Sequence, residues 1–352
     1  MQNKIFYILK LKNIFILMNY HYLSLCCIIK DESNIEEFIM YYTILGVTKF
    51  YIYDNECSWR LKDRLNTCFF KNYCEIIDYP GKCKQMDAYN DCFKNYGHLT
   101  TWLIIVDADE YILPKTKFTL TSFLEDHEDK HSIGINWVLF GTSFHDKKQS
   151  GYLIDNFRYC DDNQNNHIKV IVQPRYTINI NNPHFANMTD MRKFQDCKNN
   201  VIHKLAFNEN HTIDNIQINH YTHKSLEDSI EKHYRGNADS LNRRNIPDNS
   251  LHKCHNNKID NLLPNNYLDL IKKMSTFMHV NWYIFKHLNK DLQLNNEEDT
   301  IRYIFTNCIY ENRPLYIKDK FPNFVRESYR KEKPELNHLD DVWLEIEYIN
   351  SH

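Results

Sequence analysis

Two aspartates separated by one residue follow a strongly apolar stretch of the chain. Asp107 and Asp109 come directly after Trp102–Val106 (WLIIV), which we expect to form a buried strand. Side chains at positions i and i+2 of an extended chain point the same way. Two carboxylates so placed can hold one hard divalent cation, and that cation can bridge a diphosphate. The pair therefore predicts a metal or phosphate site, with a solvated acidic turn as the alternative.

Two earlier apolar stretches also end in acidic residues. Asp31 and Glu32 follow Tyr22–Ile29, and Asp54 follows Lys49–Tyr53. Ligands of an open α/β sheet bind beyond the carboxyl ends of its strands. We expect these acidic ends to converge on one edge of a sheet with Asp107 and Asp109. The structural alternatives are a carboxylate at a helix start for Asp31 and a local turn for Asp54.

A histidine and three cationic side chains come later in the chain. His220 ends a predicted strand, and a neutral imidazole is a good ligand for divalent metals. Lys224 precedes a predicted helix, on which Lys232 and Arg235 share a face because they are three residues apart. These cations could neutralise a leaving diphosphate. The alternative for His220 is a histidine with hydrogen-bond partners in the core. The alternative for the cations is a solvent-exposed helix face.

The elements that must position these side chains alternate between strand and helix up to residue 110. This order predicts an open α/β sheet with helices on both sides, followed by further, antiparallel strands and a mostly helical C-terminal part. The strands expected are 22–29, 49–53, 74–77, 102–106, 132–140, 152–157, 167–172 and 216–220. The helices expected are 35–45, 59–70, 85–96, 120–126, 225–239, 267–279, 283–287 and 300–309, and the C-terminal part closes with a mixed segment, 340–349.

Composition excludes several classes of protein. The chain has 352 residues but only 7 Gly, and none of them forms a G-x-G-x-x-G or G-x-x-x-x-G-K loop. A protein kinase, a P-loop ATPase and a dinucleotide-binding dehydrogenase are therefore disfavoured. The net charge of −3 predicts no nucleic-acid partner.

The chain divides by pattern into three parts. Residues 1–20 are an apolar segment, 21–240 a transferase-like domain with halves 21–112 and 113–240, and 241–352 a helical extension. The apolar segment is broken by charged residues and too short to span a membrane, and no other stretch could cross one. Eleven scattered Cys without a C-x-x-C motif indicate reduced thiols. We expect a cytoplasmic protein, in the host cytoplasm or a virion if it is viral.

Several separated strings resemble one family in the same order along residues 22–240. They are LCCIIKDESNIEEFIMYYTILGVTKFYIYDN, QMDAYNDCF, TWLIIVDADEYILP, INWVLFGTSFH, NFRY, HIKVIVQP and INHYTHKSLEDSIEKHYRGNAD. They are similar to GT-A glycosyltransferases of family 92 and the related family-2-like group. The resemblance implies a GT-A, Rossmann-like open mixed sheet and an inverting hexosyl transfer. It also implies a nucleotide-sugar donor, usually UDP-linked, and a divalent cation, commonly Mn²⁺ with Mg²⁺ as the other choice.

The resemblance also implies roles for individual residues. Asp107, Asp109 and His220 would form the metal shell. The donor nucleotide would contact Asp31, Glu32, Asp54, Gln85, Asp87, Asp107, Lys224, Lys232 and Arg235. The acceptor would be a glycan, a glycoprotein or a glycolipid.

Inversion needs a base that takes the proton of the acceptor hydroxyl. Asp146 and His145 are the candidates in a loop that resembles a family loop near the acceptor, and Glu110 and Asp239 are the others. Trp137 and Phe140 could form an aromatic platform for a sugar ring, and core packing would explain them equally well.

Two other functions are compatible with the same acidic strand ends. A metal-dependent nucleotidyl- or phosphotransferase would need a third acidic ligand, which here would be Asp31 or Asp54. A non-catalytic sugar-binding structural protein would need none of these carboxylates.

Overall fold

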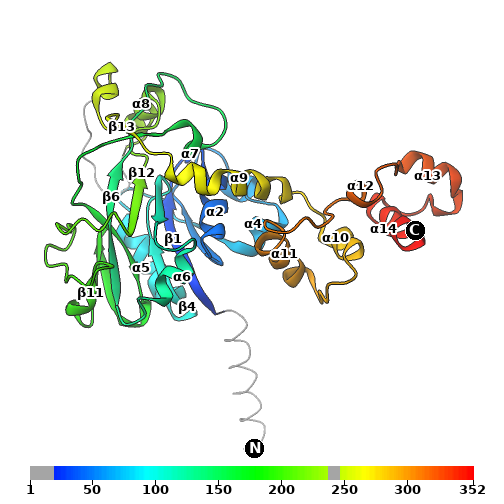
Figure 1. Ribbon diagram of the computed structural model, residues 1–352, viewed down its shortest axis with the longest axis horizontal. Coiled ribbons are helices and arrows are strands. Elements are labelled where there is room, and N and C mark those ends of the chain that lie inside the picture. Colours follow the sequence, from blue (N-terminus) through cyan, green and yellow to red (C-terminus); the bar gives the residue numbers. More distant parts are fainter. Residues whose placement is uncertain (1–19, 237–245) are drawn as a thin grey trace, which may run out of the picture. The chain divides into compact units, whose positions relative to one another are not determined.

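The computed structural model describes residues 20–236 and 246–352, and one large sheet forms its centre (Figure 1). The strands of this sheet are β1 (His21–Ile29), β2 (Lys49–Asp54), β3 (Cys74–Asp78), β4 (Thr100–Ile105), β5 (Glu110–Pro114), β6 (Ser132–Leu139), β8 (Ile168–Val172), β11 (Phe194–Gln195) and β12 (Ile216–His220). Their spatial order is β3-β2-β1-β4-β8-β6-β12-β5, and β11 pairs with β6. This is a mixed, mostly parallel α/β sheet, as the resemblance implies.

Strand direction decides which side chains meet at the edge of this sheet. Neighbours β3, β2, β1 and β4 are parallel, as are β6 and β12. Strand β8 is antiparallel to both β4 and β6, so β6 runs the same way as β4. The carboxyl ends of β1, β2, β4, β6 and β12 therefore share one edge. The amino ends of β8 and of β5, which is antiparallel to β12, lie at that same edge.

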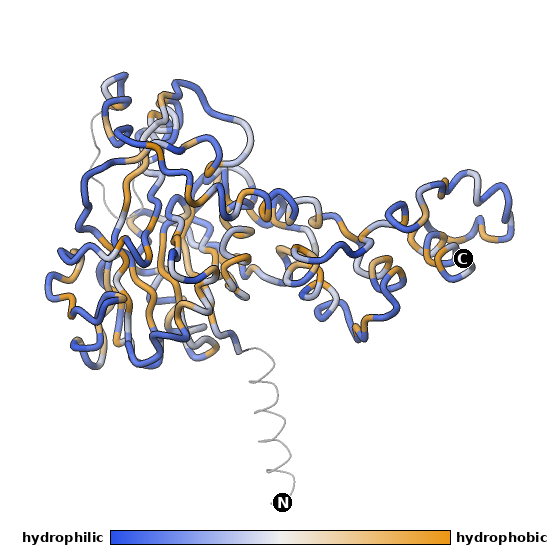
Figure 2. The backbone as a smooth tube through the Cα atoms, in the orientation of Figure 1, coloured by the Kyte–Doolittle hydropathy of each residue, from blue (hydrophilic) through white to orange (hydrophobic). Residues whose placement is uncertain are grey.

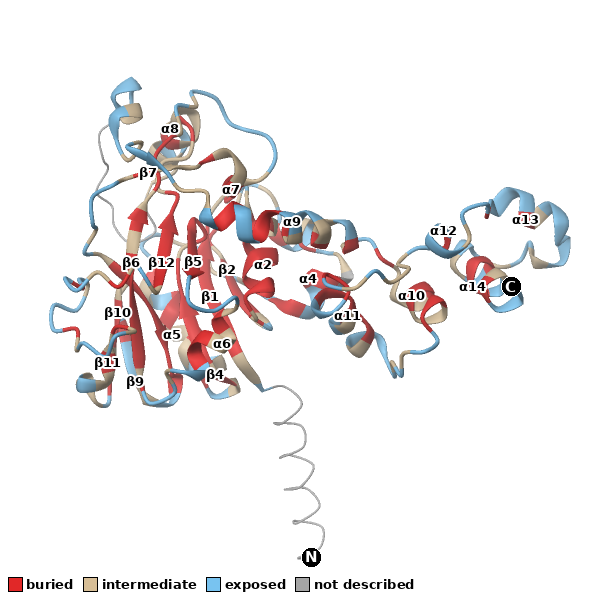
Figure 3. Ribbon diagram, viewed as in Figure 1, coloured by how far each residue is buried: buried red, intermediate tan, exposed pale blue. Residues whose placement is uncertain are grey.

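Helices cover both faces of the sheet because its strands are apolar on both sides. Helix α5 (Gln85–Tyr96) packs with the hairpin β9 (Thr177–Asn182)–β10 (Phe185–Met188) on one face. On the other face, Phe38 and Tyr41 of α2 (Ile35–Ile44) contact Tyr111 of β5 at ring-centroid distances of 5.7 and 5.1 Å. Figure 2 shows the strands as largely hydrophobic, and Figure 3 shows them as largely buried.

Two predicted elements are wrong. Residues 152–157 form not a strand but the short helix α7 (Leu153–Asn156). The buried Glu37 carboxylate accepts the backbone N–H groups of Leu153 (2.6 Å) and Ile154 (3.1 Å), which satisfies the start of that helix. The helix predicted over 59–70 is broken into α3 (Leu61–Arg64) and α4 (Cys68–Tyr73).

The remaining small elements lie around the sheet edge and in the outer loops. They are α6 (Leu120–Glu125), α8 (Leu226–Arg235), β7 (Tyr159–Cys160), β13 (Lys258–Ile259), and the 3-10 helices η1 (Gly97–Leu99), η2 (Pro174–Tyr176), η3 (Met191–Lys193) and η4 (Asn249–Lys253).

The described residues divide into two compact units. One unit runs up to Leu65 and from Tyr73 to Leu268, and it contains the sheet. The other comprises 66–72 and 269–352 and is helical, as predicted for the C-terminal part. The boundary between the two units, after Leu268, falls within α9 (Leu262–Phe277). The later elements of the second unit are α10 (Trp282–Leu288), α11 (Glu297–Thr306), α12 (Ile317–Lys320), α13 (Arg326–Glu332), η5 (Pro334–Leu336) and α14 (Asp341–Ser351).

The apolar segment predicted at 1–20 lies outside the described residues except for Tyr20. Within 20–236 and 246–352, the longest apolar helices fall short of what is needed to cross a membrane. Ten of the eleven cysteines have described side chains, and all ten are free thiols.

Candidate functional site

Asp107 lies just beyond β4 at the shared edge and is held by three protein donors. Its Oδ1 accepts hydrogen bonds from Gln85 Nε2 (2.7 Å) and the Tyr89 hydroxyl (3.1 Å). Its Oδ2 accepts one from Lys169 Nζ (3.0 Å). Burial works to raise the pKa of Asp107, but the charge and hydrogen bond of Lys169, together with His220, lower it on balance. Asp107 is thus an ionised, fixed acceptor, and Gln85, which is predicted to contact the donor, lies against it.

Lys169 is the residue of this group that sequence analysis missed. It lies at the amino end of β8, and its side chain is only 1 % exposed. Its ammonium also lies 3.6 Å from a carboxylate oxygen of Glu110, which is fully buried. Burial raises the pKa of Glu110 well above its ordinary value, which favours the neutral carboxyl. A lone lysine inside the apolar string IKVIV was the signal available in the sequence.

Asp109 lies two residues further along, in the turn between β4 and β5, and meets a different set of partners. Its Oδ2 accepts a hydrogen bond from Lys232 Nζ (2.7 Å), and its Oδ1 lies 3.7 Å from Nε2 of His220. Burial works to raise the pKa of Asp109, but Lys232, His220 and Lys224 together hold it well below its usual range. Burial lowers the pKa of His220 to about 4, so its imidazole is neutral. The sheet brings Asp109 and His220 together as predicted.

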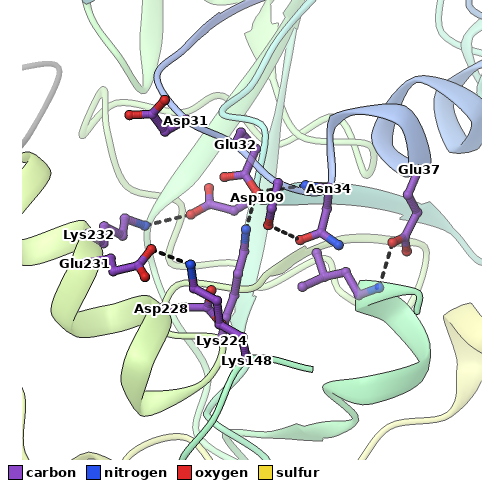
Figure 4. A network of polar contacts seen from close by, with 12 residues as sticks. Asp31, Glu32, Asn34, Glu37, Asp109, Lys148, Lys224, Asp228, Glu231 and Lys232 are labelled. Atoms are coloured by element: carbon purple, nitrogen blue, oxygen red, sulfur yellow. Dashed lines mark hydrogen bonds and ion pairs between the residues drawn. The ribbon is translucent and has the colours of Figure 1, made fainter. Parts of the chain in front are cut away.

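Helix α8 carries two of the predicted cations and starts beside the third (Figure 4). Ser225 begins the helix through a capping box with Asp228. Just before it, Lys224 has a positive φ of 56° and pairs with the Glu32 carboxylate. From the last turn, Arg235 donates to the carbonyl oxygens of Lys30 (2.6 Å) and Asp31 (3.2 Å). Helix α8 therefore brings its cations to the carboxyl ends of β1 and β4.

The other predicted donor residues have local partners. Asp31, at a positive φ of 51°, accepts hydrogen bonds from the backbone and hydroxyl of Ser58 (2.6 and 2.7 Å). Asp54 Oδ1 accepts the backbone N–H of Cys57 (2.9 Å). Both carboxylates thus order the loop after β2. Asp87 is exposed on α5 and pairs with Lys84 (2.8 Å).

The two residues predicted as the base lie after β6. Nε2 of His145 lies 3.1 Å from the Asn156 carbonyl oxygen, so this nitrogen carries the proton. The Asp146 side chain is 71 % exposed, and its carboxylate lies 2.9 Å from His252 Nε2. The catalytic role of both residues stays a prediction, and Asp239 lies outside the described residues.

Of the two aromatic residues considered as a sugar platform, only Trp137 is accessible. Phe140 is 1 % exposed and packs against Tyr221, so it belongs to the core. Trp137 is partly exposed on β6. Its indole stacks on His167 (5.1 Å between ring centroids) and meets His220 edge-on at 4.4 Å. An apolar ring face therefore borders the candidate metal ligand.

The site can be tested for its fit to a divalent cation. In the described part of the chain, no group of three or more His, Cys, Asp or Glu side chains is arranged to hold a metal ion by itself. Both oxygens of Asp107 already accept protein donors, whereas Asp109 Oδ1 and His220 Nε2 remain available as ligands. A carboxylate and a neutral imidazole suit Mn²⁺. The residues therefore fit a cation that takes its remaining ligands from a diphosphate and water.

Comparison with known proteins identifies the family to which a chain with this fold and site belongs. The chain matches glycosyltransferase family 92 over residues 22–262 and belongs to this family. A protein of Oryza sativa subsp. japonica that is named as a glycosyltransferase family 92 protein is 25 % identical over 117 residues. The match covers 32 % of this chain and only 20 % of that relative. The fold is thus that of a glycosyltransferase, as the resemblance implied.

Proposed function

We propose that the protein transfers a sugar from a nucleotide-sugar donor, a UDP-sugar, to a hydroxyl of a glycan, glycoprotein or glycolipid. The transfer is a direct displacement that inverts the anomeric carbon and depends on Mn²⁺ or Mg²⁺. The observation that carries the proposal is the meeting of Asp109, neutral His220 and Lys232 at the carboxyl-end edge of a family 92 sheet. Membership of the family supports the transfer itself, and this edge supports its metal dependence.

The balance of charge at the edge favours a metal-bound diphosphate. Three carboxylates are paired with three lysine ammonium groups there, while burial favours a neutral Glu110. The pairs are Asp107 with Lys169, Glu32 with Lys224, and Asp109 with Lys232. A doubly charged diphosphate together with a divalent cation adds no net charge to this set. Either one alone would leave uncompensated charge in a partly buried site, which is costly.

In this proposal each group of residues at the edge has a different role. Asp109 and His220 would hold the cation, which supplies Lewis-acid stabilisation to the departing diphosphate. Lys224 and Lys232 exchange their carboxylate partners for diphosphate oxygens as charge develops on the leaving group. Asp107 is fixed by Gln85, Tyr89 and Lys169, and its negative charge keeps the Lys169 ammonium in place beside the site. These side chains already lie at the edge before the donor arrives, and binding requires Lys224 and Lys232 to exchange partners.

The alternative function, a phosphotransferase, needs a third acidic metal ligand. Asp31 and Asp54, the two residues available for that role, instead accept hydrogen bonds from Ser58 and Cys57 in the loop after β2. This arrangement favours the glycosyltransferase.

The proposal is tested by incubating purified protein with Mn²⁺ and a panel of UDP- and GDP-sugars and following released nucleoside diphosphate. We expect release from one donor, loss of that release with EDTA, and a loss of at least 100-fold in Asp109→Asn. Release that persists undiminished in EDTA would contradict metal dependence. No release from any donor, together with no Mn²⁺-dependent thermal shift by UDP, would contradict the function.

A further inference from the structure

A histidine–aspartate pair lies near the same sheet edge and is used by none of the interactions above. Nδ1 of His255 lies 2.9 Å from Oδ2 of Asp161, and the side chains are 24 % and 16 % exposed. The other oxygen of Asp161 accepts the backbone N–H (3.0 Å) and the side-chain amide (2.9 Å) of Asn163. The carboxylate is therefore fixed on one side and presents its second oxygen to the imidazole.

This contact determines which ring nitrogen of His255 carries the proton. A carboxylate accepts the Nδ1 proton, and the lone pair of the neutral ring is then on Nε2. Among the described residues, Nε2 of His255 has no hydrogen-bond partner, and it is not sealed from solvent. His252, three residues earlier, differs in this respect. Its Nδ1 lies 2.6 Å from the Thr142 hydroxyl, and its Nε2 lies 2.9 Å from Asp146.

A chain of contacts links His255 to the candidate donor site. Its ring stacks on His223, with 5.6 Å between centroids and 9° between planes. The residue before His223 is Thr222, whose carbonyl oxygen accepts a hydrogen bond from Lys232 (3.3 Å), the partner of Asp109. The residue after it is Lys224, the partner of Glu32. His255 therefore contacts, through the His223 ring, the segment 222–224, which contacts Glu32 directly and Asp109 through Lys232.

Gly141 allows the backbone of His255 to approach the end of β6. A Cβ at position 141 would lie 2.5 Å from the Cys254 carbonyl oxygen and 2.6 Å from that of His255, which no side chain could accept. Figure 1 shows the segment that contains η4 and β13 beside α8, beyond the carboxyl ends of the strands. An open imidazole nitrogen is thus held near the same edge of the sheet as the candidate donor site.

We propose that His255 is the general base of the transfer and that Asp161 is its positioning residue; this rests on the proposed function. The hydroxyl proton of the acceptor passes to Nε2 of His255. The freed electron pair of the acceptor oxygen forms the bond to the anomeric carbon. The bond between that carbon and the diphosphate oxygen breaks, and its electron pair leaves with the nucleoside diphosphate. The proton on His255 is then released to water.

The test measures nucleoside diphosphate release from the UDP- and GDP-sugar panel, with water as the acceptor, for variants of the whole chain. His255 has a positive φ of 56°, and asparagine tolerates this conformation better than alanine. We expect His255→Asn to lower kcat by about 100-fold or more, since a general base contributes about 10²–10⁴-fold. The KM for the donor and the Mn²⁺-dependent thermal shift by UDP stay within about twofold of wild type, as a base acting only on the acceptor requires.

Two further variants separate a base from a merely structural histidine. Asp161→Asn lowers kcat without raising donor KM, and Asp161→Glu restores part of it. His252→Asn, the matched control on the same segment, keeps kcat within about twofold. His255→Asn with more than a third of wild-type kcat, or with a raised donor KM, would overturn the assignment. A loss in Asp146→Asn but not in His255→Asn would also overturn it and give the role to Asp146. Absence of turnover by the wild-type protein, together with no Mn²⁺-dependent thermal shift by UDP, would overturn the proposed function and this assignment together.

Discussion

Removing the Lys169 ammonium is expected to destabilise the sheet-containing unit because it leaves Asp107 without its cation. At 3.0 Å and an effective dielectric constant of about 20, the attraction is about 5 kcal/mol before the cost of burying the charges. The Lys169 side chain is 1 % exposed, whereas Asp107 is 34 % exposed and partly screened by water. Breaking a buried pair costs about 3–5 kcal/mol, so we place Lys169→Met at the lower end, about 3 kcal/mol.

Urea unfolding at pH 7, followed by circular dichroism, measures this change in the free energy of unfolding. The second variant is the double change Lys169→Met/Asp107→Asn, in which both charges are absent. The amide oxygen that this change places at position 107 still accepts from Gln85 and Tyr89. We therefore expect the double variant to be more stable than Lys169→Met by about 2 kcal/mol, a coupling typical of residues in direct contact.

Two results would refute this account of Lys169. A loss below about 1 kcal/mol in Lys169→Met would mean that water already satisfies Asp107 without its partner. A double variant no more stable than Lys169→Met would mean that the unpaired charge of Asp107 is not what destabilises Lys169→Met. In either case the ion pair would not be what holds Asp107 at the site.

Two other predictions concern a buried acid and a donor-site cation. Burial raises the pKa of Glu37 to about 7 from an ordinary value of 4.5, so the folded protein keeps a proton that the unfolded chain loses. The free energy of unfolding should therefore fall by about 3 kcal/mol as pH rises from 4.5 to 7. Urea unfolding of Glu37→Gln should not show this fall. An equal fall in the variant and in wild type would contradict the prediction. Lys224→Asn should weaken UDP binding about tenfold, or about 1.4 kcal/mol, by calorimetry, whereas Lys147→Asn, a change at an 80 % exposed lysine, should not. Equal affinities for wild type and Lys224→Asn would remove Lys224 from the donor site.

Much of the fold could be predicted because its strands carry a plain signal. A short apolar run that ends in acidic residues favours a buried strand over other elements. The strand Ile216–His220 and the helix Gln85–Tyr96 have the predicted bounds. The parallel order of these strands then brings Asp107, Asp109 and His220 to one edge. The sequence pattern does not predict β5. Its residues, EYILP, follow the acidic turn directly and are therefore not distinguished from it as a separate strand.

The partners of the acidic residues could not be predicted from the sequence. Lys169 reaches Asp107 only because β8 is antiparallel, which places the start of the strand at the carboxyl-end edge. His255 meets Asp161 across 94 residues through loops that have no periodic pattern. Helix α7 begins where it does because Glu37, far away in the chain, accepts its first N–H groups. Each of these contacts depends on tertiary structure, and local sequence carries little information about it.

The most direct test of the central claim is the dependence of UDP binding on Mn²⁺, measured by titration calorimetry on wild type and Asp109→Asn. If Asp109 and His220 hold a cation that binds the diphosphate, Mn²⁺ should strengthen UDP binding by wild type at least tenfold. The same addition should change the affinity of Asp109→Asn by less than about twofold. Wild-type binding of equal affinity in Mn²⁺ and in EDTA, or an equal response to Mn²⁺ in the variant, would contradict a metal-bound donor at this edge of the sheet.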